Sequence, residues 1–424
     1  MILLLFIVFL ILLFLGFPIA FALGLSSLTY ILFTDLPFVL IPQKMYSGID
    51  VFILLSIPGF ILAGNLMNAS GITSRIIQFC NALIGHIRGG LGMANVGASM
   101  LFGGISGTAI ADTASIGTVM IPSMKKEGYD AGFSCAITAT SSTIGPIIPP
   151  SLPLIIAGTL TGLSVGRLFL AGAVPGILLG IGLIFTAYLL SVKRNYPKGE
   201  KAPFRVVVKS FYQAFWAVIM TLVILVGIVG GIFTPTEASV VAVLYAMVIG
   251  LLVYRELTIK MIPGIIMNAA KTTAALMVLV GFANLFAWIM AAEQIPRMIA
   301  DTLLGLTQNK IVLLLLINVL LLFVGAFMET IAAMIILFPT LLGIAVEVGV
   351  DPVQFAIIVV LNLVIGLTTP PLGVCLFVAS GIGKVSLEKI SLAGLPFLLL
   401  CLIVLLMVTF IPGISLYLPG LFYD

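Results

Sequence analysis

Two acidic side chains lie within long apolar stretches, where a charge is costly. Asp112 follows the turn Gly103-Gly104-Ile105-Ser106-Gly107-Thr108, and Glu329 lies within Gly325-Ala326-Phe327-Met328-Glu329-Thr330. A carboxylate inside a membrane segment is a functional candidate by default. Each carboxylate could instead satisfy backbone N–H groups that the turn leaves unpaired. The functional and the structural interpretation therefore both stay open.

Two further polar stretches interrupt apolar sequence, and both contain proline. They are Thr140-Ser141-Ser142-Thr143-Ile144-Gly145-Pro146 and Gly366-Leu367-Thr368-Thr369-Pro370-Pro371. Proline removes a backbone donor, so a helix must break there and free a carbonyl group. Freed carbonyls and nearby hydroxyls are hard oxygen ligands that suit sodium, whereas N–H groups at a half-helix N-terminus suit a substrate carboxylate. We predict both kinds of site at each break, with simple proline kinks as the alternative.

The composition is that of a membrane protein. Hydrophobic residues make up 62% of the 424 residues and charged residues only 8%, against roughly 25% charged in ordinary soluble domains. The net charge of +4 is too small to indicate a nucleic-acid partner. No nucleophile elbow, paired histidine or phosphate-binding Gly-x-x-x-x-Gly-Lys loop is present, so neither an enzyme nor an ATPase is expected. The four cysteines and the single His86 have no metal-ligand spacing, and we expect the cysteines to pack as small apolar residues.

Apolar runs long enough to cross a bilayer recur along the chain. We expect the first, which is short, to be a retained helix that continues through the bend at Gly16-Phe17-Pro18. The predicted spans lie near 2–16, 18–34, 50–69, 131–160, 166–192, 212–231, 236–254, 270–292, 353–381 and 392–412. The stretches 89–122 and 309–343 have polar, glycine-containing middles, which favours re-entrant hairpins with their tips inside the protein.

The two halves of the chain are similar to each other. The only two Pro-Pro pairs are Pro149-Pro150 and Pro370-Pro371, which lie 221 residues apart, and the same offset maps Gly104 to Gly325 and Gly145 to Gly366. Each half has five predicted spans and one hairpin. An odd number of crossings would make the second half inverted, as in many secondary transporters. We therefore predict an all-α polytopic membrane protein built from two inverted repeats.

The basic residues indicate an orientation. With the N-terminus outside the cell, 15 of the 19 Lys and Arg residues fall on the cytoplasmic side, as the positive-inside rule requires. The most basic stretch, 193–211, separates the repeats 1–192 and 212–424 and is predicted to be a cytoplasmic linker. The two hairpins would then enter the membrane from opposite faces.

Three motifs resemble those of the large membrane subunit of tripartite ATP-independent periplasmic (TRAP) transporters. They are Leu101-Phe102-Gly103-Gly104-Ile105-Ser106-Gly107-Thr108-Ala109-Ile110-Ala111-Asp112, Asn362-Leu363-Val364-Ile365-Gly366-Leu367-Thr368-Thr369-Pro370-Pro371-Leu372-Gly373 and Phe233-Thr234-Pro235-Thr236-Glu237-Ala238. The resemblance covers essentially the whole chain. One departure is Glu329, where the family pattern usually has aspartate.

The resemblance implies the ion-transporter superfamily fold, with a scaffold and a mobile transport part that moves as an elevator. The scaffold helices would lie in 1–36 and 212–254, and the transport elements would include 50–160, the hairpin 309–343 and the broken helix 353–381. It also implies sodium coupling, the bacterial inner membrane, a small four-helix membrane subunit as a separate polypeptide, and a periplasmic substrate-binding protein. The substrate would be an organic anion such as sialic acid or a C4-dicarboxylate.

Together, the residues and the resemblance give two sets of candidate ligands. The substrate contacts are predicted at Ser106, Thr108, Asp112, Glu329, Thr330 and Thr369. The sodium contacts are predicted at Gly104, Ser106, Ser141, Ser142, Thr143, Gly325, Gly366, Thr368, Thr369 and Pro370. A stand-alone cation–carboxylate symporter or antiporter of the same superfamily is the alternative, and a membrane-embedded enzyme or a passive channel fits the sequence less well.

Overall fold

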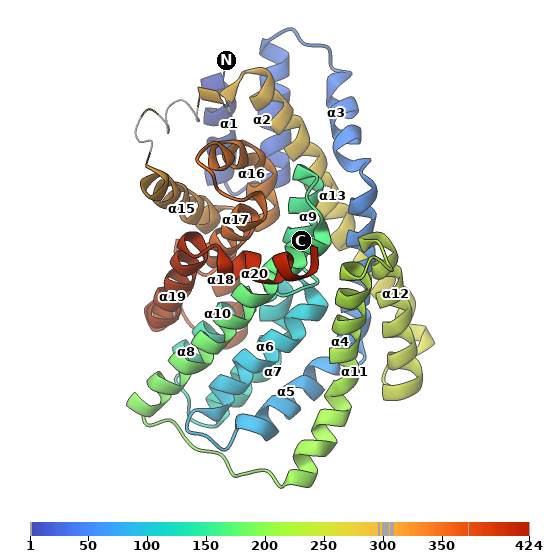
Figure 1. Cartoon of the computed structure of the whole chain (residues 1–424), viewed down its shortest axis with the longest axis vertical. Helices are drawn as coiled ribbons and strands as arrows, with labels where there is room; N and C mark the ends of the chain where they lie inside the picture. Colours follow the sequence, from blue (N-terminus) through green and yellow to red (C-terminus); the bar gives the residue numbers. More distant parts are fainter. Residues whose placement is uncertain (1, 296, 299–304, 306–308, 372, 424) are drawn as a thin grey trace.

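The computed structural model describes every residue except 1, 296, 299–304, 306–308, 372 and 424 (Figure 1). In that part the chain is helical throughout, and the only β-pairing is an isolated bridge between Arg88 and Lys198. Eight of the described helical segments are long and apolar enough to cross a bilayer. The prediction of an all-α polytopic membrane protein is confirmed.

The eight candidate spans run from one end of the chain to the other. They are Phe52–Ala69, which includes α4 (Ser56–Ala69), α10 (Val165–Lys193), α11 (Phe204–Val229), Pro235–Tyr254, which includes α12 (Pro235–Val248), α13 (Ile262–Ala292), α15 (Lys310–Phe327), α16 (Thr330–Glu347) and α19 (Leu387–Phe410).

Two pairs of consecutive helices turn back at the predicted polar motifs. α6 (Gly90–Ser106) and α7 (Ala109–Lys126) meet at Gly107, whose φ of 63° is a left-handed conformation that glycine adopts without strain. α15 and α16 meet at Met328 and Glu329. The two helical hairpins lie toward opposite ends of the long axis of the molecule (Figure 1).

Each predicted proline-containing break separates two short helices. α8 (Ala131–Ser141) and the 3-10 turn η2 (Ser142–Ile144) precede α9 (Leu152–Thr161), and α17 (Pro352–Gly366) precedes α18 (Val374–Gly383). The Pro149-Pro150 and Pro370-Pro371 bonds between them are both cis. α18 packs against α7 and α8, and α16 packs against α9 and α17. Each hairpin therefore contacts broken helices from both halves of the sequence.

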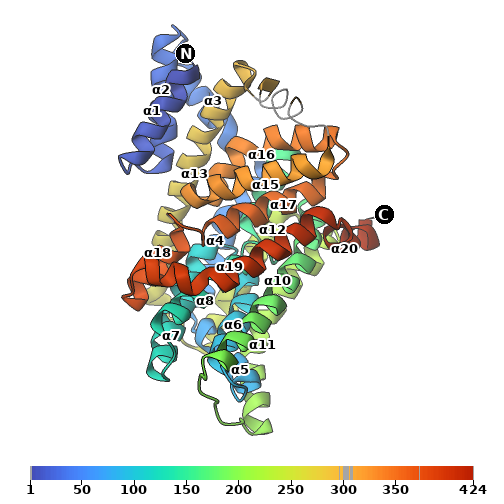
Figure 2. The ribbon, with the colours of Figure 1, turned by 90° about the vertical axis from the view of Figure 1, so that its left-hand side faces the viewer.

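A second group of helices surrounds α13. α2 (Ile19–Phe33), α3 (Leu40–Ile49) and α4 pack against it, and α4 also packs closely against α12 (Figure 2). Close approach at these contacts depends on glycine: a Cβ at Gly24 would lie 2.7 Å from the Phe282 ring, and one at Gly59 would meet Ser239.

One expectation about the first span is wrong. α1 (Ile2–Phe14) does not continue through the following bend. The chain reverses at Gly16, which has a φ of 83°, and α2 runs back against α1 (Figure 2). Glycine permits the reversal because it has no Cβ to clash in this backbone conformation.

Three described α-helices lie outside the predicted spans and hairpins: α3, α5 (Ile72–Ile84) and α20 (Gly413–Tyr423). α5 joins α4 to the first hairpin and packs against α6 and α11. It buries Ile72, Ile76 and Cys80 on one face and exposes polar side chains on the other, so it is too polar to register as a span. The chain ends with α20, which packs against α10.

Candidate functional site at the hairpin tips

The tip of the first hairpin is organised around Asp112. The Ser106 hydroxyl donates a hydrogen bond to one carboxylate oxygen of Asp112, and the backbone N–H of Thr108 donates to Ser106 Oγ over 3.3 Å. Asp112 is fully buried, and its second oxygen has no hydrogen-bond partner in the described part of the chain. That oxygen faces Gly145 closely enough to occupy the place of a Cβ there. Asp112 therefore lies between the hairpin tip and the first broken helix.

Pairs of glycines bring each tip against a break. A Cβ on Gly103 would lie 2.6 Å from the Cα of Gly145, and a Cβ on Gly325 would lie 3.2 Å from the Cα of Gly366. Real Cβ atoms essentially never approach another atom as closely as the first of these distances. In both halves, the backbone of the tip contacts the backbone of the break directly, which leaves carbonyl groups close to the surrounding hydroxyls.

The N-terminus of α7 faces a cavity. The first N–H groups of an α-helix have no intrahelical partners, and Thr108, the extended N-cap residue of α7, makes no side-chain hydrogen bond to them. A cavity of about 160 Å³ lies beside it, and Ser106 and Thr108 line this space. Free N–H groups at a helix N-terminus attract anions. An anion that entered this cavity would therefore lie close to the first N–H groups of α7.

The N-terminus of α16 differs at the corresponding point. One carboxylate oxygen of Glu329 accepts hydrogen bonds from the N–H groups of Ile331, at 2.9 Å, and Ala332, at 3.3 Å. Glu329 is thus the N-cap of α16, which supports its structural interpretation. Thr330 is buried, and its hydroxyl has no hydrogen-bond partner in the described part of the chain.

Polar side chains that sequence reasoning missed line the opposite wall of the cavity. Asn65 and Asn68 come from α4, and Thr272 comes from α13. The Asn68 amide donates to Ser115 Oγ on α7 over 3.2 Å, which connects the two walls. The available signal was two amide side chains three residues apart within an apolar helix, a spacing that places them on one helix face.

The hydroxyls at the two breaks are hydrogen-bonded to their own helices. Ser142 donates to the Thr138 carbonyl over 2.7 Å, and Thr143 donates to the Thr140 carbonyl over 2.6 Å. Thr368 and Thr369 both donate to the carbonyl of Ile365. Ser141 shares a hydrogen bond with Ser99 of α6 in addition to the bond within its own helix. A hydroxyl that donates its proton keeps oxygen lone pairs that can bind a cation.

The predicted ligands fall into separate clusters. Ser106, Thr108 and Asp112 lie together at the first tip, whereas Glu329, Thr330 and Thr369 do not line its cavity. The Gly104 carbonyl already accepts a hydrogen bond from Thr221 over 3.0 Å. No group of three His, Cys, Asp or Glu side chains could hold a metal within the described ranges. The oxygen donors present suit a hard cation such as sodium. Leu372 of the second motif lies outside the described residues.

The third motif marks a helix start. The Thr234 hydroxyl accepts from the Glu237 N–H over 3.2 Å, and the Glu237 carboxylate accepts from the Thr234 N–H over 2.8 Å. This is a capping box at the beginning of α12, and it satisfies two N–H groups that would otherwise lack partners.

Comparisons with known proteins agree with the motifs. Residues 6–414 match the family model described as the tripartite ATP-independent periplasmic transporter, DctM component. The chain is 43% identical over 412 residues to the sialic acid TRAP transporter large permease protein SiaM of Vibrio cholerae serotype O1, covering 97% of this chain and 96% of the relative. It is 37% identical over 421 residues to the C4-dicarboxylate TRAP transporter large permease protein DctM of Rhodobacter capsulatus, covering 96% of each.

A solved structure shares the fold. The Alcanivorax borkumensis YdaH transporter superposes with a TM-score of 0.58 over 90% of this chain and 88% of the other, at 17% identity. At this level of identity, the similarity concerns the arrangement of the helices alone.

Proposed function

Because this chain belongs to the family of the DctM component of tripartite ATP-independent periplasmic transporters, we propose that it carries an organic anion across the bacterial inner membrane together with sodium ions. A periplasmic binding protein would deliver the substrate, and a small four-helix membrane subunit would complete the transporter. Its relatives carry names that refer to sialic acid and to C4-dicarboxylates. Both substrates contain carboxylates, and we propose an organic carboxylate as the transported anion here.

The observation that carries the proposal is the uncapped N-terminus of α7 beside the cavity. A substrate carboxylate would accept hydrogen bonds from the first N–H groups of α7 and from the hydroxyls of Ser106 and Thr108. The amides of Asn65 and Asn68 on the facing wall would contact the rest of the substrate. The Glu329 carboxylate already accepts from the first N–H groups of α16, whereas the Asp112 carboxylate of the first tip accepts from the Ser106 hydroxyl. We therefore assign the anion site to the first hairpin.

We place the sodium ions at the two breaks, where glycine contacts bring backbone carbonyls near Ser and Thr hydroxyls. Neutral oxygen ligands bind sodium weakly enough to release it in each cycle. Alternating access would arise from movement of the hairpins and broken helices past the group of helices around α13. This proposal moves α4, which the resemblance counted among the transport elements 50–160, to the stationary group, because α4 packs against α12 and α13. The cavity fits this proposal because its walls come from α4 and α13 on one side and from the first hairpin on the other.

The test is sodium-driven uptake in proteoliposomes that contain this chain, the small subunit and the binding protein. Ser106→Ala and Thr108→Ala should each raise the half-saturation concentration for substrate or sodium. Loss of one hydroxyl contact costs about 1–3 kcal/mol, which corresponds to an increase of about 5- to 150-fold.

Matched controls exist on the same helix. Thr118→Ala and Ser123→Ala remove hydroxyls that donate to carbonyls of α7 itself and do not line the cavity. Unchanged half-saturation in both tip variants, with normal expression, would place the site elsewhere. Uptake without the binding protein would instead indicate a stand-alone symporter.

A further inference from the structure

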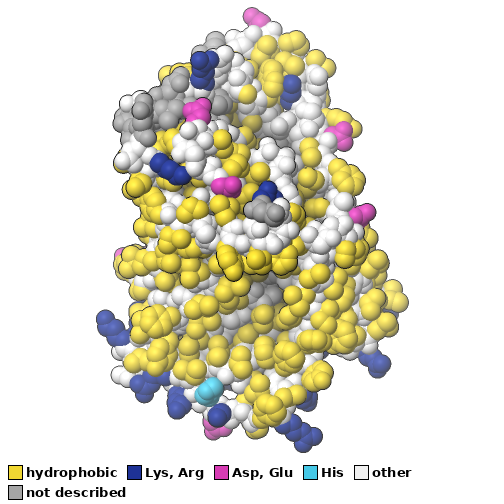
Figure 3. Space-filling model, in the orientation of Figure 1, with side chains coloured by type: hydrophobic (Ala, Val, Ile, Leu, Met, Phe, Trp, Pro, Cys, Tyr) yellow, Lys and Arg dark blue, Asp and Glu magenta, His cyan; other side chains and the backbone are white. Residues whose placement is uncertain are grey.

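The segment between α10 and α11 carries a concentration of unpaired positive charge. Within residues 193–209 there are six basic residues and a single acidic residue, Glu200. The basic residues are Lys193, Arg194, Lys198, Lys201, Arg205 and Lys209. All six are exposed, and within the described residues Arg194 alone has an ion-pair partner, Asp130. Dark-blue side chains gather at the end of the molecule where this segment lies (Figures 1 and 3).

This basic segment lies at a membrane surface. It directly joins two helices that are long and apolar enough to cross a bilayer, α10 and α11, so it remains within reach of the lipid headgroups. Aromatic side chains flank it: Phe204 is 82% exposed and Tyr212 is 67% exposed. Exposed aromatic rings beside a row of basic residues are typical of the boundary between the bilayer and the cytoplasm.

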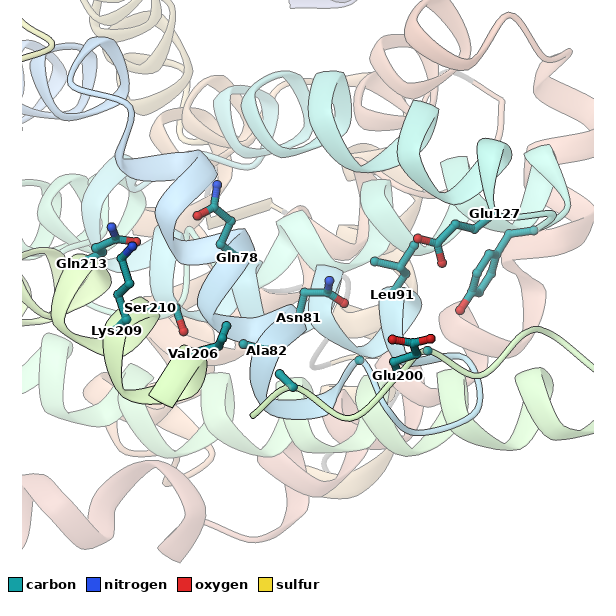
Figure 4. A pocket seen from close by; sticks show the side chains of 14 residues that line it. Gln78, Asn81, Ala82, Leu91, Glu127, Glu200, Val206, Lys209, Ser210 and Gln213 are labelled. Atoms are coloured by element: carbon teal, nitrogen blue, oxygen red, sulfur yellow. The ribbon is translucent and has the colours of Figure 1, made fainter. Parts of the chain in front are cut away.

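A cavity beside the segment has polar and charged lining residues that suit a lipid headgroup. It has a volume of about 580 Å³ and lies between α5, the basic segment and the first turns of α11 (Figure 4). Lys209, Gln213 and Gln78 line one end of it, whereas Glu127 and Glu200 line the other (Figure 4). A phosphate group is attracted to the lysine end and repelled by the two carboxylates, so the lining defines where an anion would bind.

We propose that the basic segment and the start of α11 bind the phosphodiester headgroups of anionic phospholipids in the cytoplasmic leaflet. Lys209 would contact the phosphate from the cavity lining, and Lys201 and Arg205, which lie outside that lining, would attract it from the adjoining surface. The positive charges complement the lipid charge, and the exposed ring of Tyr212 follows Lys209 along α11 toward the apolar part of the span. Binding would fix the segment that joins α10 to α11. This interaction is independent of which anion the protein transports.

The test compares lipid binding to the detergent-purified, delipidated full chain by native mass spectrometry. Phosphatidylglycerol and phosphatidylcholine with the same acyl chains compete for the protein. The unmodified chain should prefer phosphatidylglycerol. The variant K201Q/R205Q/K209Q should lose the preference, with binding weakened about fivefold for each basic residue that contacts the headgroup.

A control variant removes the same charge elsewhere. Lys126, Lys260 and Lys384 are exposed and have no ion-pair partner in the described part of the chain. K126Q/K260Q/K384Q should keep the preference for phosphatidylglycerol. If both triple variants lost the preference for phosphatidylglycerol equally, net charge alone would explain the binding, and the proposal would be overturned. An unmodified chain that showed no preference between the two lipids would overturn it as well.

Two further measurements secure the interpretation. The single variants Arg205→Gln and Lys209→Gln should each weaken lipid binding while keeping the elution volume and melting temperature of the unmodified chain, which guards against misfolding of the triple variant. Soluble glycerol phosphate at millimolar concentration should not displace the lipid. Displacement would mean that the site recognises a free phosphate compound rather than the membrane, and it would overturn the proposal.

Discussion

Thr108 and Glu329 are both N-cap residues of the second helix in a hairpin, but only one of the two side chains caps its helix. Thr108 makes no side-chain capping bond, whereas the Glu329 carboxylate accepts from two N–H groups of its own helix. A capping carboxylate also interacts favourably with the positive end of the helix dipole. On this difference rests our proposal that a ligand carboxylate binds at the first hairpin and not at the second.

Substitutions of Glu329 distinguish capping from a role in transport. Glu329→Gln keeps a carbonyl oxygen that can accept the same hydrogen bonds, so we expect uptake to survive. Glu329→Ala leaves the N–H groups without a cap and should cost about 0.5–2 kcal/mol of stability, measured as a lower melting temperature. If Glu329→Gln abolished uptake at an unchanged melting temperature, the charge itself would take part in the cycle.

Asp130 is a second residue whose role can be tested, and it lies outside the membrane spans. It caps α8 by accepting from the Phe133 N–H at 2.9 Å and lies 3.2 Å from the Lys389 ammonium. Partial burial raises the pKa of Asp130, but the Phe133 N–H and Lys389 outweigh burial and hold the pKa below its ordinary value. Its contribution to stability is therefore present near neutral pH and is lost as the pH falls through the lowered pKa.

We expect Asp130→Asn to keep the cap and lose the ion pair, with a small effect on stability because the side chain is partly exposed. Asp130→Ala should also lose the cap, at a cost of about 1 kcal/mol. Melting temperatures measured across the acid range provide the check. Both variants should show a weaker dependence on pH than the unmodified chain, and an unchanged dependence would assign the acid sensitivity to other groups.

At the scale of the elements, glycine sets how closely a hairpin tip approaches a broken helix. A Cβ on Gly103 would lie 2.6 Å from the Cα of Gly145, one on Gly145 would meet the Asp112 carboxylate, and one on Gly366 would lie 2.3 Å from the carbonyl carbon of Gly325. The helices must therefore separate, or neighbouring side chains must move, if any of these residues is enlarged. Packing of this kind fixes the positions of the hydroxyls and carbonyls that we assign to the ions.

Gly145→Ala tests this contact. The new Cβ would meet the Asp112 carboxylate and lie 3.4 Å from the Cα of Gly103. Overpacking of a close contact costs about 1–3 kcal/mol, so we expect a lower melting temperature and a large loss of uptake. Gly343→Ala in α16 is the matched control, because nothing lies within 4 Å of its Cβ position. If the two variants had the same melting temperature and the same uptake, the contact between the first tip and its broken helix would tolerate an added methyl group.

At the scale of the whole molecule, the hairpin of α6 and α7 and the hairpin of α15 and α16 lie in opposite halves along the long axis (Figures 1 and 2). This arrangement is compatible with the orientation predicted from the basic residues, in which the segment 193–211 is cytoplasmic and the loop after α16 is periplasmic. The inverted repeat itself remains a prediction, since it depends on how the chain is inserted in a membrane.

Cysteine labelling tests that orientation. A cysteine at Glu200 should react with an impermeant thiol reagent only from the cytoplasmic side, and one at Glu347 only from the periplasmic side, because positively charged loops stay in the cytoplasm. The native cysteines are free and buried, so they should give little background labelling. Labelling of both positions from the same side would contradict the inverted repeat.

The sequence by itself determined the class of protein and the places where its helices turn. Water cannot dissolve a chain with this much apolar surface, so the composition alone required a membrane. The glycine-rich turns near Asp112 and Glu329 and the Pro-Pro pairs mark where helices end, because those residues act on the local backbone. The effects of these residues on the local backbone can be predicted from the sequence without knowledge of the fold.

The tertiary structure decided what surrounds those turns. It placed Asn65, Asn68 and Thr272 opposite the first tip, reversed the chain between α1 and α2, and ordered α5 between α6 and α11. It also showed that Glu329 folds back onto its own helix while Thr108 faces a cavity. These outcomes depend on contacts between segments far apart in the chain and on which rotamer a side chain adopts in packed surroundings, and neither is encoded in local residue patterns.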